Sequence, residues 1–273
     1  MKRISPYKAV SVVVIAILAV LFIFPLYWIL TGSLKDAAAI NAAVPQWFPE
    51  SPTTDNYVRL FENPAGRWMF NSVFMAVMAM ILTCISASMA GYVLAKKRFI
   101  GKTVLFSIFI CAMALPKQVI LIPLLKEMAF LKLHDSLWAV ILPTVGWPFG
   151  VFLMKQFSEG IPGELLEAGR IDGAGEIRTF TDVVLPIIKP GIGALAIFTF
   201  INAWNDYFLQ LIMLNSRTKL TISLGIAKLQ SEMSTDFGLI MAGAALAAVP
   251  IITIFLIFQK YFTKGITMGA VKG

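Results

Sequence analysis

Apolar residues in this chain are gathered in six long, nearly uncharged stretches, which shorter polar segments separate. A helix needs about 20 consecutive apolar residues to cross the hydrocarbon core of a bilayer, and each stretch is close to that length or longer. The pattern predicts an all-α polytopic bundle that forms one transmembrane domain over residues 1–273. The predicted spans are Ala9–Leu34, Trp68–Ala95, Thr103–Leu125, Ser136–Met154, Gly191–Leu214 and Phe237–Gln259.

Two of these stretches contain polar side chains that are unfavourable in lipid. The third carries Lys117, and the fifth carries the run Trp204, Asn205 and Asp206. An acid inside a span is costly unless it faces water, protein or the outer interface. Two interpretations stay open: Asp206, with Asn205 and Trp204, lies on a solute pathway, or the run is an aromatic anchor at the membrane interface.

The composition agrees with a chain whose solvent is membrane lipid. Apolar residues make up 58% of the sequence and charged residues 14%, whereas soluble domains have about 45–50% and 25%. The net charge of +8 is dispersed between the apolar stretches, so no basic patch for nucleic acid is expected. Placing both termini in the cytoplasm puts most of the 23 Lys and Arg residues on the inner side, as the positive-inside rule requires.

Candidate chemistry is sparse. The one histidine, His134, excludes a multi-histidine metal site, and Cys84 and Cys111, which lie in apolar stretches, are expected to be small buried hydrophobes. Gly101-Lys102-Thr103 is similar to the end of a phosphate-binding loop, but the glycine that this loop also requires is replaced by Lys96. We expect no catalytic residue, no metal site and no ATP site in this chain.

The segment 158–186 differs from the other connections because it is long and acidic, with six acids against two bases. The negative inner leaflet should repel it toward the cytoplasm. Pro162 suits the start of a helix, and Gly173 suits its end because glycine reaches left-handed dihedrals easily. A second short helix, with Ile177, Phe180 and Val184 on one face, should end at Leu185-Pro186 before the fifth span.

The first of these two helices has a shallow apolar face formed by Ile161, Leu165, Ala168 and Gly169 at helical spacing. Small residues on such a face let another surface approach closely. Two interpretations follow from the residues alone: the helix docks onto a partner protein, or the two helices form a compact hairpin packed on their own bundle.

The same segment resembles the membrane subunits of ATP-binding-cassette importers. Those proteins carry a cytoplasmic Glu-Ala-Ala motif, a glycine after three further residues and, nine residues later, Ile-x-Leu-Pro. This chain has Glu167-Ala168 and Gly173 at that spacing, with Gly169 in place of the second alanine and Val183 in place of isoleucine. Weaker similarities to the carbohydrate branch, and to the smaller permease of maltodextrin-type importers, are Asn71-Ser72, Leu115-Pro116, Ile122-Pro123, Trp204-Asn205-Asp206 and Gly269–Gly273.

The resemblance implies a permease of the type I importer fold, in a bacterial or archaeal inner membrane, that forms half of a pathway for a sugar or oligosaccharide. Its partners would be a second homologous permease, two copies of a cytoplasmic ATPase that holds ATP and Mg²⁺, and an extracytoplasmic solute-binding protein. The C-terminal tail, with Gly269 and Lys272, would reach the seam between the ATPases. The residues implied in coupling are Glu167, Ala168, Gly169, Arg170, Asp172, Gly173, Leu185 and Pro186.

Two other classes of membrane protein compete with this interpretation. A secondary transporter or channel driven by an ion gradient would use ionisable relays inside the membrane, and this chain offers only Lys117 and Asp206 for that purpose. A membrane scaffold would need no ordered docking segment. Co-purification with an ATPase would separate the importer from both.

Overall fold

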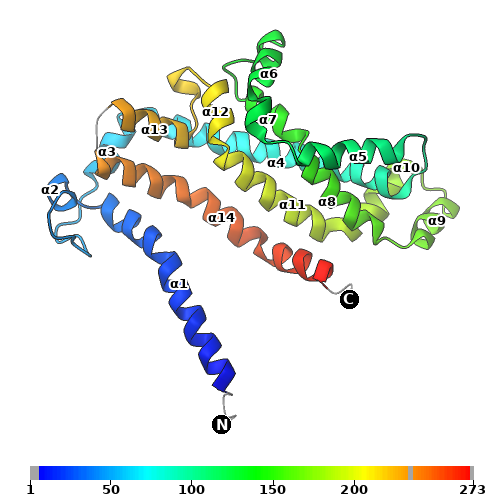
Figure 1. The fold of residues 1–273 in the computed structure, drawn as a ribbon, viewed down its shortest axis with the longest axis horizontal. Coiled ribbons are helices and arrows are strands. Elements are labelled where there is room, and N and C mark those ends of the chain that lie inside the picture. Colours follow the sequence, from blue (N-terminus) through cyan, green and yellow to red (C-terminus); the bar gives the residue numbers. More distant parts are fainter. Residues whose placement is uncertain (1–5, 233–235, 271–273) are drawn as a thin grey trace. The chain divides into compact units, whose positions relative to one another are not determined.

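The computed structural model describes residues 6–232 and 236–270, and the side chains of residues 7–231 and 236–259. Within these ranges the regular structure is helical, as predicted for an all-α chain (Figure 1). The helices are α1 Pro6–Ser33, α2 Ala37–Ile40, α3 Asp55–Phe61, α4 Ala65–Lys96, α5 Lys102–Met113, α6 Lys117–Phe130, α7 Trp138–Val145, α8 Pro148–Glu159, α9 Gly163–Ile171, α10 Glu176–Arg178, η1 Thr179–Val184, α11 Leu185–Asn205, α12 Tyr207–Met213, η2 Arg217–Lys219, α13 Ile222–Glu232 and α14 Phe237–Ala270.

Among the described residues, five helical stretches are long and apolar enough to cross a membrane, and a sixth is added if the bent pair α5–α6 counts as one span. The fourth predicted span is the pair α7–α8, which runs to Glu159 instead of ending at Met154. The last helix continues beyond the predicted end at Gln259 as far as Ala270.

The third predicted span is not one straight helix. The chain bends by 108° between α5 and α6, and Figure 1 shows α6 directed away from the line of α5. Pro116 lies at the break in an extended conformation (φ −61°, ψ 128°) and ends the α-helical path. Proline has no N–H to donate and restricts the residue before it, so Leu115-Pro116 divides an apolar stretch that hydropathy alone treats as continuous.

The structure differs from the predicted fifth span at both of its ends. No second cytoplasmic helix ends at Leu185-Pro186, because the helical path runs unbroken from Glu176 to Asn205. Pro186 lies in the first turn of α11, and the preceding turn, η1, has π geometry in which the Leu185 N–H bonds to the Phe180 carbonyl. This wider turn accommodates the proline. The helix then ends at Asn205, and α12 follows as a separate element.

The described chain divides into two units, Met1–Gly66 with Gly225–Val249 and Arg67–Leu224 with Pro250–Gly273. In the first unit, Asn56 is buried and its amide donates to the carbonyl oxygens of Ser33 (2.9 Å) and Lys35 (2.7 Å). Arg59 forms an ion pair with Asp236. The polar segment that contains Asn56 is therefore ordered against the end of α1.

In the second unit α8 packs against α11 and α5, and α4 approaches α8 closely; Figure 1 shows α4, α8 and α11 alongside one another. A Cβ atom added at Gly91 of α4 would lie 2.6 Å from the backbone N of Lys155, and one added at Gly150 of α8 would lie 3.3–3.4 Å from Ala87 and Leu195. Glycine thus lets the helices approach within one chain. Buried Met154, Val184, Ile188 and Leu195 belong to the apolar cluster that these helices enclose.

Buried polar side chains hold the irregular segment that follows α12. Asn71 of α4 donates to the carbonyl oxygens of Thr218 and Leu220, both at 2.9 Å. Ser72 accepts from the N–H of Ile222 at 2.8 Å. Since all of these groups lie in the second unit, Asn71-Ser72 fixes the return of the chain toward α13.

Candidate functional site

The helix α9 has the boundaries that were expected from Pro162 and Gly173. Pro162 lies at its N-terminal cap and Gly163 is its first residue. At the other end, the N–H of Ala174 donates to the Gly169 carbonyl (2.9 Å) and the N–H of Gly173 to the Arg170 carbonyl (3.0 Å). Gly173 has φ +77°. This pair of bonds with a left-handed glycine is the Schellman motif, which confirms the predicted end of the helix at Gly173.

The base of α9 is attached to the end of α4. The Lys96 ammonium donates to the carbonyl oxygens of Glu159 (3.0 Å) and Ile161 (2.6 Å), in the turn that joins α8 to α9. Ile161 is buried, and Leu166 packs against the apolar cluster of the second unit. These contacts attach the N-terminal end of α9 to α4 and α8. A displacement of α9 would therefore act on both of those helices.

An ion pair attaches the chain that follows α9, at Glu176, to the end of α4. Glu176 contacts Lys97, and Arg170 lies 3.7 Å from Glu176. The Lys97 ammonium also lies 5.3 Å from the ring centroid of Tyr92. Burial lowers the pKa of Lys97, but its hydrogen bonds and charge interaction with Glu176 and Tyr92 outweigh burial and raise the pKa above its ordinary value. Lys97 therefore stays charged and ties the Glu176 end of the segment to the end of α4, whereas Lys96 ties the end at Ile161.

The outer side of this segment is apolar and uncovered within the chain. Leu165 and Ala168 are exposed on α9, and Ile171 at its end and Ile177 in α10 are 85% and 81% exposed. The predicted apolar face is thus divided, because Ile161 points into the core whereas Leu165 and Ala168 face outward. The second predicted face is divided as well: Ile177 is outside, whereas Val184 is fully buried.

The other residues implied in coupling surround this exposed face. Glu167, Arg170 and Asp172 are exposed, and a Cβ atom added at Gly169 would lie 3.7 Å from Val183. Leu185 is half-buried and Pro186 is exposed at the start of α11. Gly269 lies near the end of α14, and Lys272 lies outside the described residues, so the C-terminal contact stays a prediction.

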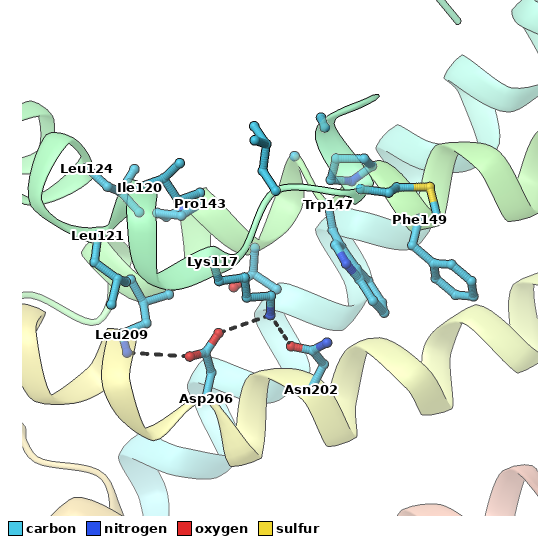
Figure 2. A pocket seen from close by; sticks show the side chains of 16 residues that line it. Lys117, Ile120, Leu121, Leu124, Pro143, Trp147, Phe149, Asn202, Asp206 and Leu209 are labelled. Carbon is cyan, nitrogen blue, oxygen red and sulfur yellow. Dashed lines mark hydrogen bonds and ion pairs between the residues drawn. The ribbon is translucent and has the colours of Figure 1, made fainter. Parts of the chain in front are cut away.

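A cavity of about 410 Å³ lies elsewhere in the second unit, beside the α5–α6 bend. Figure 2 shows the side chains of Lys117, Asn202 and Asp206 converging on it from α6 and from the end of α11. Its remaining wall is mostly apolar and aromatic: Ala112, Met113, Leu115, Ile120, Leu121, Leu124, Pro143, Thr144, Gly146, Trp147, Pro148, Phe149 and Leu209.

Lys117 is the centre of the polar group. Its ammonium donates to Asn202 Oδ1 (2.6 Å) and to Asp206 Oδ2 (3.2 Å). Asp206 also caps α12, because its Oδ1 accepts from the N–H of Leu209 at 3.4 Å. A cation on the first residue of a helix is not favoured by the helix dipole, so the carboxylate offsets an otherwise unfavourable charge at the start of α6.

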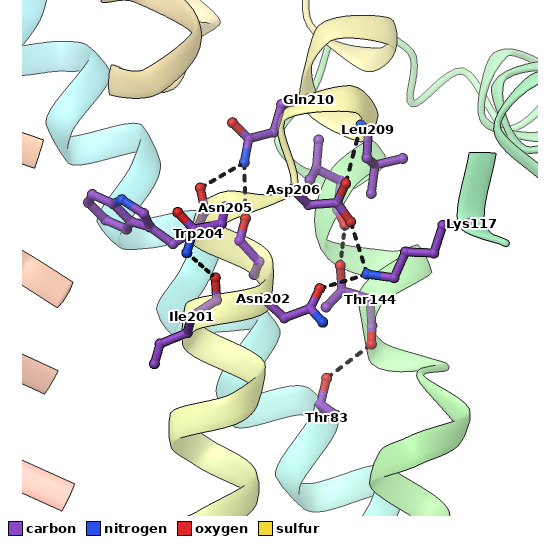
Figure 3. Close-up of polar contacts among 12 residues, drawn as sticks. Thr83, Lys117, Thr144, Ile201, Asn202, Trp204, Asn205, Asp206, Leu209 and Gln210 are labelled. Atoms are coloured by element: carbon purple, nitrogen blue, oxygen red, sulfur yellow. Dashed lines mark hydrogen bonds and ion pairs between the residues drawn. The ribbon is translucent and has the colours of Figure 1, made fainter. Parts of the chain in front are cut away.

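The three residues predicted for the pathway separate in the structure. Asp206 lines the cavity, but Asn205 is exposed and donates to the Ile201 carbonyl at 3.0 Å. Trp204 is buried with its ring stacked on Phe200 at 5.6 Å, and Figure 3 shows it on the side of α11 away from Lys117. Asn202 was not predicted as a site residue. Its position one helical turn before Asp206 was the available signal.

Within the described ranges, no group of three or more His, Cys, Asp or Glu side chains is close enough to hold a metal ion. The polar side-chain groups of the cavity are one ammonium, one carboxylate, one amide, one hydroxyl and the indole N–H of Trp147. Such a set donates and accepts hydrogen bonds.

Comparisons with known proteins agree with one another. Residues 87–268 match the family described as the binding-protein-dependent transport system inner membrane component. The chain is 34% identical to the arabinooligosaccharides transport system permease protein AraQ of Bacillus subtilis (strain 168), over 98% of this chain and 97% of the relative. It is 31% identical to the maltodextrin transport system permease protein MdxG of the same organism, over 97% and 96%.

A third relative is the sulfoquinovosyl glycerol transport system permease protein SmoH of Agrobacterium fabrum, which is 32% identical over 97% of this chain and 94% of its own length. Among solved structures, a chain of a bacterial ABC transporter involved in the import of the acidic polysaccharide alginate superposes with a TM-score of 0.83. The two chains are 22% identical, and the superposition covers 94% of this chain and 96% of the other. The chain belongs to the family of binding-protein-dependent transport system inner membrane components.

Proposed function

We propose that this chain is a permease subunit of an ATP-binding-cassette importer and forms half of the translocation pathway for a sugar or oligosaccharide. The family membership supports an importer driven by ATP over a transporter driven by an ion gradient. Support for a carbohydrate comes from the relatives, whose names refer to arabinooligosaccharides, maltodextrin and sulfoquinovosyl glycerol. The chain performs no bond chemistry, and ATP with Mg²⁺ is bound by partner subunits.

The single observation that carries the coupling role is the geometry of α9. Its outer side exposes apolar residues, and the chain before and after it is tied to the end of α4: Lys96 donates to the Ile161 carbonyl before the helix, and Lys97, the residue after α4, pairs with Glu176 beyond it. We infer that its outer face, with Leu165, Ala168 and Ile171, is seated in a cytoplasmic ATPase. The contact residues are Glu167, Ala168, Gly169, Arg170, Asp172 and Gly173, and Leu185 and Pro186 begin the helix that carries the motion into the membrane.

The assembly that follows from this role has four further chains. They are a second homologous permease, two copies of the ATPase and an extracytoplasmic solute-binding protein; a structure of an alginate ABC transporter in complex with its periplasmic protein supports the last. Both termini lie in the cytoplasm of a bacterial or archaeal cell, which places α9 on the ATPase side and Asp206 toward the outside. The C-terminal tail, with Gly269 and Lys272, contacts the seam between the ATPases.

The decisive experiment replaces Gly173 by Asp. The side chain would impose strain at φ +77° and add negative charge beside Asp172 at the docking surface. The variant should insert in the membrane but lose ATPase co-purification and sugar uptake together. Glu167→Lys should act in the same direction more weakly, through a change of charge on the exposed face.

Gly101 provides a matched control for backbone strain. It has φ +84°, and like Gly173 it has no atom within 4 Å of an added Cβ, but it lies at the start of α5 instead of α9. Gly101→Asp should therefore keep the ATPase bound. Normal ATPase binding and uptake in Gly173→Asp would show that α9 is not the coupling element.

A further inference from the structure

The cavity beside the α5–α6 bend has the size and the lining of a small-ligand site. Its volume of about 410 Å³ falls in the range of about 300–1,000 Å³ that ligand pockets occupy, and such pockets are mainly apolar with a few convergent polar groups. Here the convergent groups are Lys117, Asn202 and Asp206, all on one side of the cavity (Figure 2).

We propose that this cavity is a subsite for a neutral sugar residue of the transported saccharide, which the Lys117–Asp206 pair recognises by its hydroxyl groups. The proposal rests on the proposed function, since it names the class of solute and the place where this subunit contacts it.

The balance of charge in the wall favours a neutral ligand. Lys117 and Asp206 are the only ionisable side chains among its described lining residues, and they are paired at 3.2 Å. An acidic sugar would have to compete with Asp206 for the ammonium and would be repelled by the carboxylate. A neutral hydroxyl group needs only the hydrogen-bonding capacity that the pair leaves unused.

That capacity is available. An ammonium has three donors, and Lys117 uses two of them, toward Asn202 and Asp206. A carboxylate has about four acceptor positions, and Asp206 uses one for Lys117 and one for the Leu209 N–H. A hydroxyl group can therefore accept from Lys117 and donate to Asp206 while the ion pair stays intact. The side chains of Lys117 and Asp206 are 50% and 17% exposed, so a solute can reach both.

Two aromatic side chains of the wall supply an apolar surface for the ring of the sugar. Trp147 and Phe149 both line the cavity, with ring centroids 4.9 Å apart. Aromatic rings offer large flat contact areas, against which the C–H face of a sugar can pack while its hydroxyl groups point to Lys117 and Asp206. A polar group together with an aromatic pair in one wall fits a pyranose or furanose ring, which has both polar and apolar surfaces.

The test uses the complete importer in proteoliposomes with its binding protein, and labelled arabinotriose, maltotriose and trigalacturonate as probes. Lys117→Met and Asp206→Asn remove one charge each, and Asp206→Asn keeps an acceptor for the Leu209 N–H. Each should lower uptake of the neutral probe about tenfold or more, the effect of losing a hydrogen bond to a charged group. Because all variants share one binding protein, its own selectivity cancels from the comparison.

Lys126→Gln is the control, since Lys126 is exposed on the same helix and does not line the cavity; its uptake should equal that of the wild type. Asp206→Asn, which leaves Lys117 without its counter-charge, should also raise the uptake of trigalacturonate relative to the neutral probe.

Three results would overturn the subsite while leaving the proposed function intact. They are unchanged neutral uptake in both variants, an unchanged ratio of trigalacturonate to neutral uptake in Asp206→Asn, and loss of the ATPase from Asp206→Asn, which would show that the ion pair is structural. Uptake that continues when the catalytic residues of the ATPase are removed would instead overturn the proposed function.

Discussion

Gly169 and Gly173 lie four residues apart, yet the backbone requires glycine at only one of them. Gly173 has a left-handed φ of +77°, which side chains with a Cβ atom adopt at a cost of roughly 1 kcal/mol. Gly169 is inside α9 with helical neighbours, and an added Cβ atom would make ordinary contacts with Val183 (3.7 Å) and Thr179 (3.9 Å). The two positions therefore predict opposite effects of the same substitution.

Gly169→Ala should stabilise α9, because alanine in a helix interior is favoured over glycine by about 0.8–1.0 kcal/mol. Gly173→Ala should destabilise the end of the helix by a similar amount. Hydrogen exchange of the α9 amides in the purified importer measures both, with slower exchange expected for the first variant and faster exchange for the second. Faster exchange in Gly169→Ala would mean that the 3.7 Å contact with Val183 is already too close.

Asp135 is a second residue whose surroundings matter, because they set the pKa of its carboxyl group. It has φ +54° and accepts from the N–H groups of Asn215 (2.9 Å) and Ser216 (3.0 Å), beside Lys219. Burial alone would raise the pKa of this carboxyl group, but the hydrogen bonds from Ser216 and Asn215 and the charge of Lys219 hold its pKa well below the ordinary value of 3.8.

A lowered pKa means that the ionised form stabilises the fold. This contribution is complete above pH 3.8, the ordinary value, and is lost as the pH falls below it toward the folded-state pKa. Asp135→Asn should lower the free energy of unfolding by about 1 kcal/mol at pH 7, as expected for hydrogen bonds to a partly exposed charge. The difference from the wild type should shrink below pH 3.8.

Thermal unfolding of the purified complex across this pH range checks the prediction. Asp135→Ala should lose further stability at every pH, because alanine tolerates a positive φ less well than Asn or Asp. If the thermal midpoints of Asp135→Asn and the wild type change with pH in parallel, the charge of the carboxylate is not what holds the 215–219 segment.

Among the elements, the contact between α4 and α8 depends most strictly on one small residue. An added Cβ atom at Gly91 would lie 2.6 Å from main-chain atoms of Met154 and Lys155. Main-chain atoms cannot rotate away, so the two helices would have to separate along their length. Small residues at such positions let the backbones of membrane helices approach closely.

Gly91→Ala should therefore destabilise the second unit by about 1–3 kcal/mol, the usual effect of overpacking. The amount of folded protein in the membrane and the thermal midpoint of the purified complex report this loss. Gly160→Ala is the matched control at the end of α8, since its added Cβ atom would meet only the Phe157 carbonyl at 3.6 Å. Equal stability of the two variants would contradict the close approach at Gly91.

The elements also show what the sequence could and could not predict. Hydropathy predicted the membrane helices, and a single glycine predicted the end of α9. The bend at Leu115-Pro116 was missed because the apolar stretch continues through it, and Pro186 was taken as a stop although a π turn carries the helix past it. The pairing of Lys117 with Asp206 was not predictable, because 89 residues separate them and no local pattern links the two.

In the molecule as a whole, α11 joins the two candidate sites. It begins directly after η1 beside the coupling segment and ends at Asn205, next to the cavity residue Asp206. A helix of 21 residues is about 32 Å long at about 1.5 Å per residue, which is the thickness of the hydrocarbon core. A displacement of α9 can therefore move the cavity residue Asp206 through one continuous helix, α11.

The C-terminal region gives a prediction for the assembled importer. Residues 264–273 contain three glycines and only two charges, a composition poor in charge for a solvated tail. Deleting 266–273 should leave the complex assembled but lower its substrate-stimulated ATP hydrolysis several-fold, because the proposed contact at the ATPase seam is lost. ATPase co-purification and hydrolysis rates are measured side by side, and full hydrolysis by the truncated complex would exclude the contact.

The bend between α5 and α6 has a consequence for how this permease can be studied and how it can evolve. Where one helix ends and the next begins, main-chain groups leave the regular helical ladder. Here the N–H groups of Ala114 and Leu115 turn back to the carbonyl oxygens of Cys111 and Ala112, beside the cavity that Ala112, Met113 and Leu115 line. Groups of the main chain are the same in every amino acid except proline. Alanine scanning would leave this turn unchanged, so amide-to-ester replacement at Ala114 or Leu115 is the method that can detect its contribution. Evolutionary substitutions at residues 112–115 can likewise change the sequence without changing these main-chain groups.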